Sequence, residues 1–127
     1  MLRLLALVFG LAFLPAAAQE ERLVLPSGLE VALHEVLYDA DLATARFRFV
    51  AEDVGVPGFN PDALLEDLEA LCSEFALPVL SAAHPEARAL VLSVASAPSP
   101  FGASDPGVTQ FFEGFEAEGD NCIWSAY

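Results

Sequence analysis

Residues 29–50, LEVALHEVLYDADLATARFRFV, contain the clearest structural pattern in the chain. Apolar and polar side chains alternate over residues 29–38 and again over residues 43–50, as in strands with one buried face. The polar turn at residues 39–41 can join the two runs as a β-hairpin. Glu35 interrupts the apolar alternation, which indicates a bulge or a strand end at that point. Any register that pairs the apolar faces puts His34 on the outer face with Arg46 and Arg48.

The next pattern is that of an amphipathic helix. Asn60 can cap its start and Pro61 suits the first helical position. Apolar residues then recur at helical spacing and form one buried stripe: Leu64, Leu65, Leu68, Leu71, Cys72 and Phe75. The acidic residues of this segment, Asp67 among them, are expected on the solvent side, and Pro78 is expected to end the helix.

Three further strands are expected after the helix, over residues 89–95, 108–116 and 122–127. Between the first two lies APSPFGASDPG, residues 97–107, whose prolines and glycines predict a long loop. The order is strand, strand, helix, strand, strand, strand. We therefore expect an α+β fold, an antiparallel sheet of four to five strands with one helix packed on one face.

The first 18 residues have the three parts of a secretory signal peptide. Arg3 supplies the positive charge, residues 4–14 form the apolar run, and residues 15–18 end in small side chains. A membrane anchor is the alternative, but a spanning helix needs about 20 apolar residues. We expect cleavage before Gln19, a single acidic domain over residues 19–127, and a periplasmic or secreted location.

The mature domain is strongly acidic. Loss of Arg3 leaves four arginines and no lysine against 19 acidic residues, a net charge of −15 with both histidines neutral. Such a surface repels phosphate backbones and anionic headgroups, so nucleic-acid binding and membrane binding of the mature form are not expected. A basic protein or a divalent cation remains compatible with this charge, as does a simple role in keeping an exported protein in solution.

Cys72 and Cys122 are the only cysteines of the chain. In an oxidising compartment such a pair predicts a disulfide, here closing a loop of about 50 residues. A redox-active pair and a metal site are the alternatives, but C-x-x-C spacing and clustered ligands are both lacking. We expect a structural disulfide, no metal site and no cofactor.

Several segments of the mature chain form a recognisable set: ARFRFV at 45–50, Leu71-Cys72, Phe101-Gly102, Asp105-Pro106, residues 109–113 (TQFFE) and Cys122-Ile123-Trp124. With these segments the chain resembles a family of small exported bacterial proteins, a domain of unknown function from alphaproteobacteria. The resemblance covers nearly all of the mature chain. It implies export and one shared domain, and it implies no activity, ligand or partner.

Two functional hypotheses follow from single residues. Phe101 lies in the long loop, and the adjacent Phe111 and Phe112 cannot both face the interior of a one-sided sheet. These aromatic residues favour a non-enzymatic binding or accessory protein that contacts another exported protein. The alternative is a small periplasmic hydrolase or ligand-binding enzyme centred on His34, whose polar neighbours could tune it for acid–base chemistry. A surface histidine in a cross-strand charge pair is the simpler explanation of His34, and the pattern favours it over a catalytic role.

Overall fold

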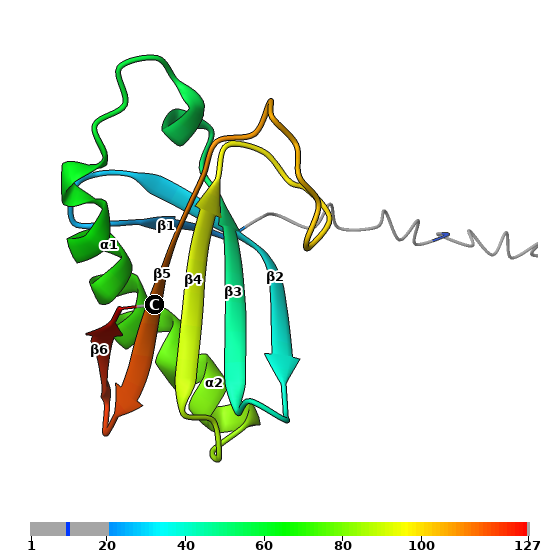
Figure 1. The fold of residues 1–127 in the computed structure, drawn as a ribbon, viewed down its shortest axis with the longest axis vertical. Coiled ribbons are helices and arrows are strands. Elements are labelled where there is room, and N and C mark those ends of the chain that lie inside the picture. The colour runs from blue at the N-terminus through cyan, green and yellow to red at the C-terminus, as the bar shows by residue number, and fades with distance from the viewer. Residues whose placement is uncertain (1–9, 11–20, 127) are drawn as a thin grey trace, which may run out of the picture.

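The computed structural model describes residue 10 and residues 21–126 (Figure 1). The predicted signal peptide, residues 1–18, therefore lies outside the described residues except for Gly10. No helix within the described part of the chain is long and apolar enough to cross a membrane. The strands are β1 (Arg22–Val24), β2 (Glu30–Asp39), β3 (Thr44–Val50), β4 (Ala89–Ala95), β5 (Gln110–Glu118) and β6 (Asn121–Ser125). The helical elements are η1 (Glu52–Gly55), η2 (Pro61–Ala63), α1 (Leu64–Leu71), η3 (Cys72–Ala76) and α2 (Leu77–Ala83).

The strands form one six-stranded sheet in the order β1-β2-β3-β4-β5-β6. The predicted α+β class is confirmed, but the predicted antiparallel sheet of four to five strands is wrong in number and direction. The short β1 adds a strand beside β2, and β3 and β4 are parallel while the other neighbours are antiparallel. The parallel pair arises because the helical segment crosses over between β3 and β4, and a crossover returns the chain in its original direction.

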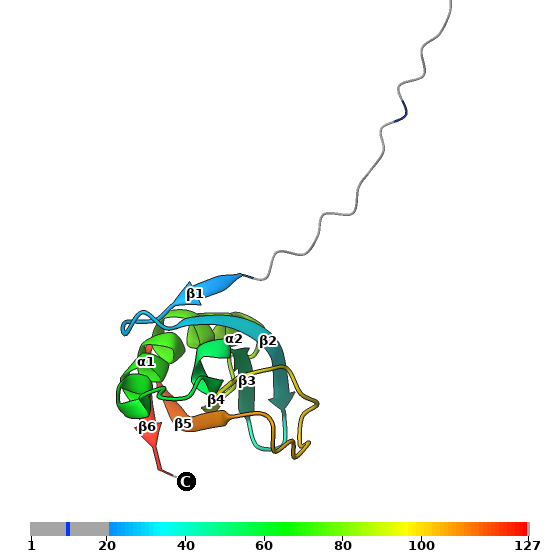
Figure 2. The same ribbon diagram turned by 90° about the horizontal axis from the view of Figure 1, so that it is seen from above.

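The sheet curls around the helical segment, which lies on its concave side (Figure 2). The largest fully buried side chains gather between these two layers: Val31, Phe47, Phe49, Leu68, Cys72, Leu90, Leu92, Val94 and Phe115. Those that belong to strands occupy alternate positions, as the pleat requires. The residues between them, including Arg46 and Arg48, therefore face the convex side.

The helix begins as predicted and ends later than predicted. The Asn60 side chain accepts a hydrogen bond from the Asp62 amide at 3.0 Å, with Pro61 in the first position. Pro78 does not end the helix, because the chain passes through the π-helical turn η3 and Pro78 falls in the first turn of α2. Proline is tolerated in a first turn, where no intrahelical N–H bond is required of it.

One helix carboxylate is buried, against the expectation that all face solvent. Asp67 is only 2% exposed. It accepts hydrogen bonds from the amide of Ser27, at 2.9 Å, and from the hydroxyl of the same residue. These bonds compensate the burial of the carboxylate and fix the turn between β1 and β2 to the helix.

The predicted disulfide is present. Cys72, at the start of η3, is bonded to Cys122 in β6, with the Cα atoms 5.9 Å apart. The amide of Cys122 also donates to the Ser73 hydroxyl at 3.0 Å. The last strand is thus fastened to the buried side of the helical segment.

A bulge divides β2 into two registers. Leu33 lies opposite Phe49, but Glu35, not His34, lies opposite Arg48. The extra residue reverses which side chains of β2 share the convex face. The interruption predicted at Glu35 is therefore a bulge, and Glu35 rather than His34 is the residue of β2 that lies opposite Arg48.

Candidate functional site

The convex face of the sheet bears a cavity of about 260 Å³. Its floor belongs to β3, β4 and β5, and its wall belongs to the loop of residues 96–109, which lies on the opposite side of the strands from the helices (Figure 2). The lining residues are Arg46, Arg48, Val91, Ser93, Ser99, Pro100, Phe101, Gly102, Ala103, Gln110 and Phe112. None of them is acidic.

Hydrogen bonds close the base and the tip of this loop. The Ser96 amide donates to the Thr109 carbonyl at 2.9 Å, and the Thr109 amide donates to the Ser96 hydroxyl at 3.0 Å. At the tip, the Ala103 amide donates to the Pro100 carbonyl at 3.1 Å. Gly102 has φ +79° there, which a type II turn requires at its third residue and which glycine adopts without strain. This turn holds Phe101 at its corner.

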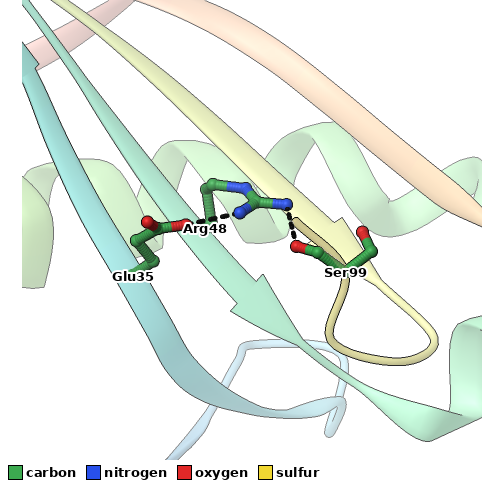
Figure 3. A network of polar contacts seen from close by, with 3 residues as sticks. All are labelled: Glu35, Arg48 and Ser99. Atoms are coloured by element: carbon green, nitrogen blue, oxygen red, sulfur yellow. Dashed lines mark hydrogen bonds and ion pairs between the residues drawn. The ribbon is translucent and has the colours of Figure 1, made fainter. Parts of the chain in front are cut away.

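Arg48 joins the loop to two strands (Figure 3). It is 8% exposed, and its guanidinium donates to Glu35 Oε2 at 2.5 Å and to the Ser99 carbonyl at 2.8 Å. The Glu35 carboxylate balances the charge of this buried arginine, which would otherwise be costly to bury. The β2 bulge is what brings Glu35 into reach.

Phe101 lies over both arginines of the cavity. Its ring centroid is 5.5 Å from the Arg46 Cζ and 5.6 Å from the Arg48 Cζ, within the range of cation–π contacts. Arg46 forms no ion pair with any residue in 21–126, so its charge has no carboxylate partner in that part of the chain. Within residues 21–126, the cavity therefore has one positive charge without an ion pair, in an acidic protein.

The three predicted partner-binding phenylalanines do not lie together. Phe101 and Phe112 both line the cavity and are each 58% exposed. Phe111 faces the helical side, where its ring packs 6.0 Å from that of Phe59. The pleat explains this split between neighbours, since successive residues of a strand point to opposite faces.

His34 lies at the β2 bulge, exposed to solvent, beside an open hollow formed with residues 98–101. Its ring forms no hydrogen bond or ion pair with the residues that the structure describes. The enzyme hypothesis requires a carboxylate or hydroxyl bonded to this ring, so the geometry does not favour it. Among residues 21–126, no group of three or more His, Cys, Asp or Glu side chains is placed to hold a metal ion.

The second histidine belongs to a separate cluster at the far end of β2. His84 stacks on Tyr38, with ring centroids 3.7 Å apart, and its Nδ1 is 3.4 Å from Glu86 Oε1. The Tyr38 hydroxyl donates to the same oxygen at 3.0 Å. Partial desolvation, followed by this hydrogen bond, raises the pKa of Tyr38. A backbone hydrogen bond, followed by the bond from Tyr38, lowers the pKa of Glu86. None of the three residues lines the cavity.

Sequence reasoning found most of the polar and aromatic lining but not its arrangement. Arg46 and Arg48 were expected beside His34, and Phe101 was expected in a loop of unknown position. Ser93 and Gln110 were missed. Their signal was the strand alternation itself, which puts Ser93 on the face opposite to Leu92 and Val94.

Comparison with known proteins finds one matching family and no match that indicates an activity. No curated protein and no solved structure matches the chain. The model of one family, described as a family of unknown function (DUF6497), matches residues 8–127. This range includes every strand and helix described above, and it agrees with the resemblance seen in the sequence. The chain therefore belongs to this family of unknown function, DUF6497.

Proposed function

We propose that the chain is an exported, non-enzymatic binding protein that contacts another exported protein through Phe101 and Phe112. One observation supports this most directly: two large aromatic side chains, each 58% exposed, border the same cavity on the uncovered face of the sheet. Aromatic residues around a depression are typical of the central contacts of protein interfaces. Phe111, which packs against Phe59, is not part of this surface.

The size of the cavity is compatible with a protein partner. Sites for drug-sized ligands enclose roughly 300–1,000 Å³, whereas this cavity holds about 260 Å³. It is large enough to receive one or two side chains of a partner. The exposed rings at its border would then cover the partner surface around that anchor.

Export is the second part of the proposal. The signal-peptide pattern of residues 1–18 supports it, and so does the disulfide between Cys72 and Cys122, since disulfides persist in oxidising compartments. The partner is accordingly sought in the periplasm or outside the cell. Mass spectrometry of the exported protein tests this part: a first residue of Gln19 supports it, and a chain that retains Met1 contradicts it.

Site-specific photo-cross-linking in the producing cells tests the surface. A photoreactive phenylalanine analogue is introduced at position 101 or 112 of the complete chain, and at position 42 as the control. Leu42 is a suitable control because it is an exposed apolar residue, 65% accessible, that lies outside this cavity. We expect a discrete protein adduct from positions 101 and 112 and none from position 42. Identical adduct patterns at all three positions, or no protein adduct at 101 and 112, would contradict the proposal.

A further inference from the structure

We propose that the cavity binds a carboxylate of the partner protein, adjacent to an apolar group, and that Arg46 is the residue that holds it. This inference rests on the proposed function and specifies the chemistry of the group that enters the cavity.

The first argument is the charge balance of the cavity. Two arginines line it and no acidic residue does, although the chain has a formal charge of −14. The charge of Arg48 is matched by Glu35. Arg46 has no carboxylate partner among residues 21–126, so the cavity has a local positive charge that attracts an anion in a protein whose net charge is negative.

The second argument is the availability of the Arg46 donors. The Arg46 Cζ lies 5.5 Å from the centroid of the Phe101 ring, and a cation–π contact of this kind uses the charge of the guanidinium without occupying its N–H donors. These donors match the two oxygens of a carboxylate. Ser93 and Gln110 line the same cavity and offer further O–H and N–H donors.

The third argument is the apolar border. Phe101 and Phe112 stand beside the arginine and expose most of their surface. A carboxylate alone would leave these rings in water, whereas a carboxylate with an apolar neighbour would cover them. The group that fits is therefore an Asp or Glu side chain next to an apolar residue, or a chain terminus whose last residue is apolar.

Two matched pairs of probes test the inference on protein purified from the export compartment after expression of the complete chain. The first pair is N-acetyl-phenylalanine and its uncharged amide, which represent a chain terminus. The second pair is the blocked dipeptides acetyl-Phe-Asp-amide and acetyl-Phe-Asn-amide, which represent a side-chain carboxylate. Binding is followed by NMR chemical shifts of the residues lining the cavity. We expect at least one acid to bind about tenfold or more tightly than its neutral match, as expected for a charged hydrogen bond.

Substitutions test whether Arg46 is the residue that binds the acid. R46Q should reduce acid binding to the level of the neutral probe, and R46K should restore part of it because lysine keeps the charge without the planar fork. R88Q is the matched control, since Arg88 is an exposed arginine without an ion pair to residues 21–126 and lies outside the cavity. It should bind the acid like the original protein. Unchanged NMR spectra away from the cavity show that each variant is folded.

Two results would overturn the inference. If acids and neutral probes bind alike and lose binding with F112S, the aromatic surface binds ligands but recognises no carboxylate, and the proposed function stands without it. If no acid shifts the cavity residues, or if R88Q weakens binding as much as R46Q, Arg46 is not a carboxylate site. Failure of the proposed function itself is recognised separately, by the absence of adducts at positions 101 and 112.

Discussion

The disulfide gives the most quantitative prediction of this structure. Cys72 and Cys122 are separated by 50 residues, and the bond between them restricts the unfolded chain. On the chain-entropy relation, a closed loop of that length removes about 14 cal/mol/K from the unfolded state, or about 4 kcal/mol at 25 °C. Because small domains are stable by only about 5–15 kcal/mol, breaking the bond should cost a large share of the free energy of unfolding.

Two perturbations separate the covalent link from packing. Reduction of the bond leaves both sulfur atoms in the core, whereas C72A/C122A also removes them. Cys72 is fully buried and Cys122 is 8% exposed, so the double variant should lose roughly 1 kcal/mol more for each unfilled site. Reduced protein should therefore lose about 4 kcal/mol, and the double variant should lose more than that.

Urea unfolding measures both losses. The single tryptophan, Trp124, lies in β6 two residues from Cys122 and gives a local fluorescence signal, while circular dichroism reports the whole domain. Coincident transitions in the two signals would justify a two-state fit. The free energy of unfolding should fall more steeply with urea concentration in the reduced protein, because the unfolded chain exposes more surface without the disulfide. A loss below about 1 kcal/mol in the reduced protein would refute the chain-entropy reasoning.

Four further predictions concern packing and pH. A Cβ at position 55 would lie 2.7 Å from the Ser96 Cβ, so G55A should lower the melting temperature. G55A/S96G should recover only part of it, because it also removes the hydroxyl that accepts from the Thr109 amide. L68A should lower the free energy of unfolding by about 2–5 kcal/mol in urea titrations, because Leu68 is completely buried. The lowered pKa of Glu86 means that its stabilising effect is present above its usual value of 4.5 and is lost as pH falls through the folded value. E86Q should flatten that acidic decline in unfolding measurements, and an unchanged slope would contradict the assignment. The raised pKa of Tyr38 should delay formation of its phenolate, seen by ultraviolet absorbance in Y127F protein, to above its usual value of 10.0.

Local patterns predicted the elements well because their causes are local. The alternation of ARFRFV defined β3 and the burial of its phenylalanines, and Asn60-Pro61 defined the start of the helical segment. The end of the helix was predicted too early because a proline ends a helix only in its interior and is tolerated in a first turn. The π-helical turn η3 comes before Pro78, so that Pro78 lies in the first turn of α2. Burial of Asp67 was missed because its partner, Ser27, is 40 residues away in sequence.

The strand directions were missed for a different reason. Residues 51–88 separate β3 from β4, and a connection of that length containing a helix favours a parallel neighbour. Short loops elsewhere favoured antiparallel pairing, and that preference was extended to the whole sheet. The parallel pair matters for the site, since it sets Arg46 beside Val91 and Arg48 beside Ser93 on the convex face.

The cavity itself depends on two features, and a local pattern indicates only the first, through the break in alternation at Glu35. One is the bulge at His34, which moves Glu35 opposite Arg48 and so allows an arginine to be buried on the convex face. The other is the path of the loop 96–109, which Arg48 holds through the Ser99 carbonyl. Because Arg48 makes both contacts, the bulge and the loop position depend on one another.

This dependence gives the two arginines different roles. Arg48 is buried, paired and bonded to the loop, so its charge is used within the fold. Arg46, two residues away on the same face, contacts the Phe101 ring and has no ion pair among the residues described. A helix covers just one side of a single sheet, and here the loop covers the other side only in part. The uncovered remainder is where Arg46, without an ion pair to residues 21–126, and two exposed phenylalanines lie together, which is the combination that a partner with an apolar group and a carboxylate would complete.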